Sequence, residues 1–383
     1  MGRITIALGI ALIIILSVSI IASIDWLYYS KSTPEFFVGV EFAYASDNVT
    51  GLKGLASDLK SLVDNVKNYT NLFVIGNPEI SLDETTLNET CDYIYDAGLH
   101  FIVFFTSTTA YLYNPYVWII KASQKYGDRF LGAYRTDEPG GKQLDNNKDR
   151  FVLEAKNNTD AAENFVSILN IHLEYWIYSG TKIFTSDYGL YWFDYKAGYN
   201  TVLAQFGFNL SRPISVGLCR GAAKAQNKDW GAIVTWTYDR MPYLESGEEL
   251  YADMTLAYKA GAKYVVVFDY PKIGRHGILN SGHFEAMKNF WNYVHSNPRD
   301  YGIDRGEVAY VLPQDYGFGF RSANDNIWGF WQADQLSKKM WADANTLVNK
   351  YDSRLDIVYN DPEYSEYIKN HYNQVIFWNE TVA

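Results

Sequence analysis

Short apolar segments alternate with longer amphipathic segments between residues 34 and 298. The short ones are rich in Val, Ile, Phe and Tyr, which is typical of buried parallel strands. We predict strands at residues 36–42, 71–75, 100–105, from 130, 182–186, 201–206, 231–237 and 263–269. The longer ones predict helices at residues 52–69, 84–97, 115–126, 160–178, 214–226, 248–260 and 282–295. Eight strands that alternate with helices over residues 34–298 predict an α/β fold, the (β/α)8 TIM barrel.

The pattern changes after residue 305. Strand-like segments at residues 307–312, 355–359 and 375–378 are separated by helical patterns within residues 328–351 and 364–371. These five segments predict a small three-stranded α/β unit over residues 305–383, which we interpret as flavodoxin-like.

The amino-terminal segment is a third part, residues 1–25. Residues 4–24 carry no charge and would span about 30 Å as a helix, enough to cross a bilayer. A cleaved signal peptide is the alternative, but the apolar run exceeds its usual length. We therefore predict one transmembrane helix, with the bulk of the chain outside the cell. Six glycosylation motifs agree with this topology, at Asn48, Asn68, Asn88, Asn157, Asn209 and Asn379.

The amino-acid composition limits the classes of ligand that the protein can bind. The net charge of −11 argues against a nucleic-acid partner, because phosphate binding requires clustered Lys and Arg. The six His residues and two Cys residues show no metal-ligand spacing, so we predict neither a metal nor a cofactor. Cys91 and Cys219 fall on different predicted helices and are expected to be free thiols. The 17% aromatic content suits sugar stacking and equally suits an aromatic core.

Acidic residues stand where the predicted strands end. In a parallel barrel these ends meet at one face, the face on which such barrels build active sites. Most of these acids are expected to cap helices or bind loops. Glu138 is the exception, because Glu caps poorly and Pro139 with two glycines follows it. The strand-end acids are Glu41, Asp137, Glu138, Asp187, Asp239 and Asp269.

The run Arg135-Thr136-Asp137-Glu138-Pro139 resembles the Asn-Glu-Pro signature at the end of the fourth strand in clan A glycoside hydrolases. The resemblance implies that Glu138 is the general acid/base and that the barrel acts on carbohydrate. The carboxyl-terminal unit is similar in placement to the flavodoxin-like domain of thermostable β-galactosidases.

The chain also departs from this family. Asp137 stands where the family has Asn, and the end of strand seven, residues 235–239, lacks the family's nucleophilic Glu. Glycoside hydrolysis requires a second carboxyl group. Asp239 is the positional substitute, with Asp269, Asp187 and Glu245 as rivals.

Polar and aromatic residues at the same strand ends are candidate sugar contacts. Two functions follow from the pattern. One is a membrane-anchored extracellular glycoside hydrolase that cleaves polysaccharide or glycoconjugate. The alternative is an inactive barrel that binds glycan or a partner chain. Candidate substrate-binding residues are Asp137, Arg135, Glu41, Tyr44, Asp187, Tyr188, Trp192, Trp236, Tyr238, Arg240 and Tyr270.

Overall fold

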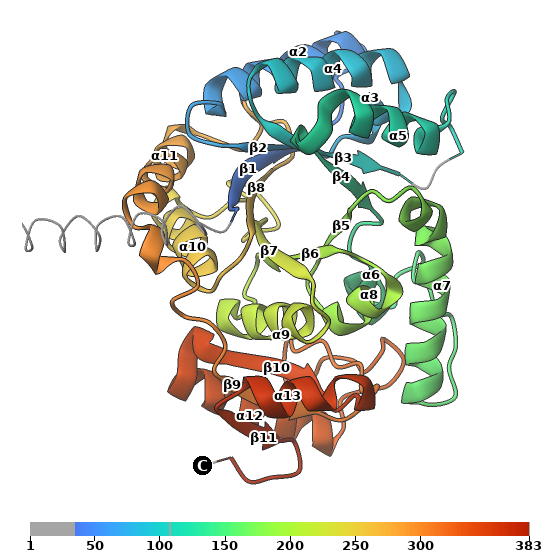
Figure 1. Ribbon diagram of the computed structural model, residues 1–383, viewed down its shortest axis with the longest axis vertical. Coiled ribbons are helices and arrows are strands. Elements are labelled where there is room, and N and C mark those ends of the chain that lie inside the picture. Colours follow the sequence, from blue (N-terminus) through green and yellow to red (C-terminus); the bar gives the residue numbers. More distant parts are fainter. Residues whose placement is uncertain (1–34, 107–108, 383) are drawn as a thin grey trace, which may run out of the picture. The chain divides into compact units, whose positions relative to one another are not determined.

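A computed structural model describes residues 35–106 and 109–382 (Figure 1). Eight parallel strands follow one another around a closed barrel, in which β1 pairs with both β2 and β8. The predicted barrel is confirmed. The strands are β1 (Phe37–Phe42), β2 (Leu72–Ile75), β3 (His100–Phe105), β4 (Phe130–Arg135), β5 (Ile183–Asp187), β6 (Thr201–Phe206), β7 (Asp229–Val234) and β8 (Tyr264–Asp269).

Helices connect the strands and cover the outside of the barrel (Figure 1). Three short helices, α3, α6 and α8, were not predicted, and the N-cap residues of α6 and α8, Glu138 and Leu190, have positive φ. The helices are α2 (Gly51–Val66), α3 (Pro78–Leu82), α4 (Glu84–Asp96), α5 (Pro115–Tyr126), α6 (Pro139–Leu144), α7 (Asn158–Tyr178), α8 (Tyr191–Ala197), α9 (Arg212–Ala225), α10 (Gly247–Lys259) and α11 (Ser281–Ser296). Short 3-10 turns are η1 (Gly127–Arg129) and η2 (Pro298–Asp300).

Large side chains fill the inside of the barrel. Phe37 and Tyr264 stack with their ring centroids 5.1 Å apart, and Phe184 meets Tyr264 edge to face at 5.2 Å. Tyr134 lies in the same cluster, so the interior is a packed core rather than a pore. Cys91 in α4 and Cys219 in α9 are buried free thiols, as predicted.

The carboxyl-terminal residues form a second, smaller sheet. Its strands β9 (Val308–Leu312), β10 (Leu355–Tyr359) and β11 (Gln374–Phe377) are parallel in the order β10-β9-β11. Helices α12 (Gln335–Tyr351) and α13 (Ser365–His371), with the turns η3 (Asp352–Arg354) and η4 (Pro362–Tyr364), complete it. The predicted three-stranded layer is confirmed; its flavodoxin-like character stays a prediction.

The second sheet packs on helix α9 of the barrel (Figure 1). Two glycines of α9 make this approach possible, because a Cβ atom at Gly217 or Gly221 would lie 2.8 Å from a backbone oxygen of β10. Between them, Arg220 is 2% exposed and donates through Nε to Asp356 Oδ1 at 2.7 Å. Lys224 binds the other oxygen of Asp356 at 2.8 Å. A buried, fully paired carboxylate therefore joins the sheet to the barrel.

The predicted membrane topology rests on the apolar segment 4–24 and on the six glycosylation motifs. No helix within residues 35–106 and 109–382 is long and apolar enough to cross a membrane, and the predicted span 4–24 lies outside the described residues. Asn48, Asn68, Asn157, Asn209 and Asn379 are exposed, as glycosylation requires. Asn88 is half-buried, and its Oδ1 accepts a hydrogen bond from Trp118 at 2.8 Å.

Arg220→Ala is expected to destabilise the protein by about 3–5 kcal/mol, because it leaves Asp356 buried with one partner charge fewer. Burial alone would raise the pKa of Asp356, but the charges of Arg220 and Lys224 lower it. The stability that this carboxylate contributes is therefore present above its unfolded pKa and lost as pH falls through the folded value.

Chemical denaturation at pH 7 measures this loss. Lys67→Ala is the control, since Lys67 forms an exposed pair with Asp64 and should cost less than about 1 kcal/mol. Equal midpoints for the two variants would contradict the role of Arg220.

Candidate active site

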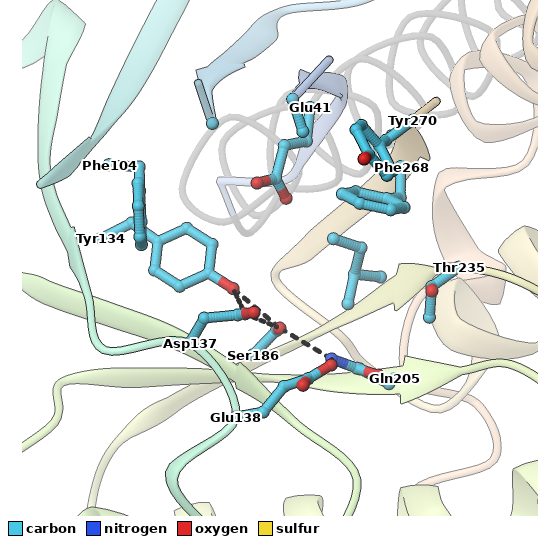
Figure 2. A pocket seen from close by; sticks show the side chains of 13 residues that line it. Glu41, Phe104, Tyr134, Asp137, Glu138, Ser186, Gln205, Thr235, Phe268 and Tyr270 are labelled. Atoms are coloured by element: carbon cyan, nitrogen blue, oxygen red, sulfur yellow. Dashed lines mark hydrogen bonds between the residues drawn. The ribbon is translucent and has the colours of Figure 1, made fainter. Parts of the chain in front are cut away.

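A cavity of about 280 Å³ opens at the carboxyl ends of the barrel strands (Figure 2). It is lined by charged and polar side chains from five of the eight strand ends, and by the aromatic rings of Phe104, Tyr134, Phe268 and Tyr270. The polar residues are Glu41 at β1, Asp137 and Glu138 after β4, Ser186 at β5, Gln205 at β6 and Thr235 after β7.

Glu138 lies at the centre of this arrangement. Its φ of 53° is in the left-handed region, a strained conformation for a non-glycine residue that directs the chain sharply out of β4. Gln205 Nε2 donates to Glu138 Oε1 at 2.7 Å. Burial and then the charge of Asp137 raise the pKa of Glu138 to about 7, while the bond from Gln205 opposes them. Glu138 can therefore gain and lose a proton near neutral pH.

Asp137 is held by two hydroxyl groups. Tyr134 Oη and Ser186 Oγ donate to its Oδ1 at 2.5 and 3.2 Å. The negative charge of Asp137 is one cause of the raised pKa of Glu138 and of Glu41. A negative charge on Asp137 thus favours the protonated forms of the other two carboxyl groups.

Glu41 faces Asp137 and Glu138 across the cavity (Figure 2). It is 5% exposed, and burial raises its pKa well above the ordinary value, with the charges of Asp137 and Glu138 adding to the effect. Gly76 gives it room, because a Cβ atom there would lie 2.3 Å from Glu41 Oε1. A protonated Glu41 can donate a hydrogen bond into the cavity.

A second hollow of about 500 Å³ adjoins the first and shares five lining residues with it, Glu138, Gln205, Thr235, Phe268 and Tyr270. Trp236 and Tyr270 line it, stacked with ring centroids 5.9 Å apart and 14° between their planes. The indole Nε1 donates to the Tyr270 carbonyl oxygen at 2.6 Å, which fixes the pair. We call the two hollows together the cleft.

The carboxyl-terminal part of the chain contributes one residue to the cleft, Arg321. Asp325 accepts from its Nε and Nη2 at 2.9 and 2.6 Å, Asp145 accepts from Nη1, and the guanidinium lies 5.6 Å from the Tyr188 ring. The two aspartates balance its charge. Arg321 therefore adds hydrogen-bond donors to the cleft without making it basic.

Of the predicted residues, Glu138, Asp137, Glu41, Tyr188, Trp236 and Tyr270 line the cleft. The predicted second acid, Asp239, does not line it; together with Tyr238 and Arg240 it is exposed on the loop after β7. The physical reason is that β7 ends at Val234, three residues before the predicted end, so the loop carries these side chains away.

Two other acids considered for catalysis are turned from the cleft. Asp269 is fully buried at the end of β8, where its Oδ1 accepts from the Ile278 N–H at 2.9 Å and so holds the following loop. Glu245 is buried and pairs with Arg212 at 3.2 Å. Neither contributes to the lining of the cleft.

Three predicted sugar contacts lie in packed interfaces instead. Arg135 follows the inward-facing Tyr134 and so points outward, where its guanidinium lies 4.5 Å from the Trp176 ring. Tyr44 is buried against Phe42 at 4.1 Å. Trp192 packs on Tyr359 of the second sheet at 5.6 Å. The structure does not bring these three to the cleft.

Asp187 is also absent from the cleft wall. It is fully buried, and its carboxyl oxygens accept hydrogen bonds from four backbone N–H groups, those of Gly140, Gly141, Tyr188 and Gly189.

Sequence reasoning did not identify Ser186, Gln205, Thr235 or Arg321. The first three stand at strand ends but carry no charge, so a search for acids passes over them. Arg321 is far from the barrel strands in sequence, and only the packing of the second sheet brings it to the cleft. Among the described residues no group of three or more His, Cys, Asp or Glu side chains could hold a metal ion.

Comparisons with known proteins support the fold. No protein-family model matches the chain, and no curated protein matches it in sequence. Among solved structures, a β-galactosidase from the psychrophilic Marinomonas ef1 is similar over 89% of this chain and 72% of that chain, with 11% identity and a TM-score of 0.53. A β-1,4-D-mannanase from Cryptopygus antarcticus matches 66% of this chain and 89% of its own, with 12% identity and a TM-score of 0.46. At these identities the likeness to the β-galactosidase establishes a shared barrel fold and nothing finer.

Proposed function

We propose that this protein is a glycoside hydrolase that cleaves polysaccharide or glycoconjugate by carboxylate acid/base catalysis. The observation that carries the proposal is Glu138, a carboxyl group with a pKa of about 7 in a cleft that contains three further carboxyl groups, those of Glu41, Asp137 and Asp145, and an aromatic wall. Glycoside hydrolysis requires one carboxyl group that donates a proton and one that is ionised.

Glu138 is the proton donor in this proposal. Its pKa of about 7 lets it protonate the leaving oxygen and regain the proton from solvent, whereas an ordinary Glu would be ionised. Gln205, hydrogen-bonded to Glu138 Oε1, holds the carboxyl group in one orientation.

Asp137 is the ionised carboxylate. Hydroxyl donors on one side leave its second oxygen available to a sugar ring, and its negative charge would stabilise an oxocarbenium-like transition state. Glu41, which retains its proton, donates a hydrogen bond from the opposite wall. Trp236 and Tyr270 supply the stacking surface for the rest of the glycan.

The location of the protein is a separate proposal. Residues 4–24 anchor the chain in the cell membrane as a single span, and the barrel lies outside the cell. The uncharged length of this segment and the exposure of five of the six glycosylation motifs support it.

Cell fractionation tests the anchor. We expect the full chain in the membrane fraction, released only by detergent. Recovery of a soluble mature protein that begins near residue 25 would contradict the anchor while leaving export intact.

Glu138→Gln is expected to lower turnover by about 10²–10⁴-fold, because the amide keeps the shape of the side chain but cannot donate the proton. The assay compares wild type and variant on a panel of soluble polysaccharides, and glycan binding should persist in the variant. Equal turnover would remove Glu138 from catalysis. Binding without turnover in the wild type would favour the alternative function, a glycan-binding barrel.

Asp137→Asn separates two roles of Asp137. Clan A hydrolases carry Asn at this position, so a residue that only binds sugar should tolerate the change. If Asp137 is the ionised carboxylate, turnover should fall by at least about 10²-fold.

Two control variants accompany Asp137→Asn. Glu41→Gln should keep most activity, since the amide can still donate a hydrogen bond, and Asp239→Asn should keep all of it. Loss of activity in Glu41→Gln with full activity in Asp137→Asn would show that Glu41, and not Asp137, acts as the second catalytic carboxyl group. Loss in Asp239→Asn would contradict the placement of the site.

A further inference from the structure

Helix α6 follows Glu138 directly but receives no cap from its side chain. The first N–H groups of a helix need acceptors, and the N-cap side chain usually supplies one. Glu138 is the N-cap of α6 and makes no side-chain cap, because its carboxyl group is directed to Gln205 in the cleft. Another residue must satisfy these N–H groups if Glu138 is to remain free for the cleft.

Asp187, at the end of the neighbouring strand β5, supplies the missing cap. Its Oδ2 accepts from the Gly140 N–H at 2.6 Å, and its Oδ1 accepts from the Gly141 N–H at 2.8 Å. The Glu138 N–H in turn donates to the Ser186 carbonyl oxygen at 3.1 Å. The end of β5 thus holds the backbone of Glu138 and of the next turn.

The two glycines after Pro139 allow this contact. A Cβ atom at Gly140 would lie 2.4 Å from the Gly189 carbonyl oxygen and 3.1 Å from Asp187 Oδ2. A Cβ atom at Gly141 would lie 2.1 Å from the Tyr188 ring. Any other residue at either position would push α6 away from Asp187.

A second carboxyl group, Asp194 in α8, lies behind Asp187. It is fully buried, and no N–H or O–H group of the described residues reaches either of its oxygens. Burial, followed by the charge of Asp187, raises its pKa well above the ordinary value. Burial also raises the pKa of Asp187, to about 7, although its four N–H donors oppose the rise. Asp194, which has no such donors, therefore takes up a proton before Asp187 does.

We infer that Asp187 is the positioning residue of Glu138: it caps α6 from β5 in place of Glu138. The inference rests on the proposed function, since it assigns a catalytic use to the freed carboxyl group. The hydrogen bonds themselves can be tested without any substrate.

Hydrogen exchange followed by mass spectrometry tests the cap in the full chain. Asp187→Asn should expose the Gly140 and Gly141 amides to exchange. The Asn side chain has one acceptor oxygen and an NH2 group, so it cannot accept hydrogen bonds from both backbone N–H groups as the carboxylate does. Asp194→Asn is the matched control, since its amide can still donate to Asp187 and protection should persist. Unchanged protection in Asp187→Asn, or equal loss in both variants, would overturn the inference.

The leaving group of the substrate tests the catalytic consequence. Asp187→Asn should slow cleavage of an unactivated glycoside by about 10²-fold, as expected for a misplaced catalytic group. It should slow cleavage of a dinitrophenyl glycoside much less, because that leaving group does not need a proton. Equal losses on the two substrates would show a structural role only.

The pH profile gives a further readout. The charged groups that face Glu138 are Asp137, Asp187 and Lys142, of which the first two raise its pKa and Lys142 lowers it. Activity should fall as pH rises through the pKa of Glu138. Asp187→Asn removes a negative charge and should move this fall to lower pH, whereas Asp194→Asn should not. An unmoved profile in Asp187→Asn would contradict the proximity of this charge.

If Asp187→Asn does not fold, Gly140→Ala replaces it, because its Cβ atom displaces the Gly140 N–H without a change of charge. The same loss of protection and the same dependence on the leaving group are expected, and normal values would overturn the inference. If the wild type cleaves no glycoside, the proposed function fails and hydrogen exchange still decides whether Asp187 holds α6.

Discussion

The closure of the barrel is the constraint on which the rest of the structure depends. Because β8 pairs with β1 along its whole length, the carboxyl ends of all eight strands surround one opening. Side chains that point into this opening therefore face one another. Carboxyl groups brought together in this way lose water and repel. No Lys, Arg or His side chain lines the inner cavity, and the crowding appears instead as raised pKa values of Glu41 and Glu138.

The architecture could be predicted from the sequence because short doubly buried strands and amphipathic helices have distinct periodicities. The rule that strand ends share a face also predicted that Glu41, Asp137 and Glu138 would meet. The same rule was too coarse for Asp239 and Asp269. It fixes the face but not where a strand stops or how the next loop runs, and a three-residue difference in β7 was enough to move Asp239 to the surface.

Other parts of the site depend on contacts between residues far apart in the sequence, which no nearby sequence pattern indicates. Gln205 is important because of the residue it touches, not because of its own chemistry. Asp187 was expected to bind substrate. Its role as the cap of α6 is visible only from its hydrogen bonds with the N–H groups of Gly140 and Gly141. Arg321 reaches the cleft because the second sheet packs against the barrel, and no pattern near residue 321 indicates that contact.

Helix α9 shows how closely the two sheets are matched. Gly217 and Gly221 lie in the interior of the helix, where each glycine costs about 1 kcal/mol of helix propensity relative to Ala. On a solvent-facing helix this would be a weakness without benefit, whereas here the missing side chains form a trough for the backbone of β10. A barrel separated from residues 305–383 would therefore expose a bare helix backbone to water and leave Arg220 without its carboxylate partner, so the second sheet completes the surface of the barrel at α9.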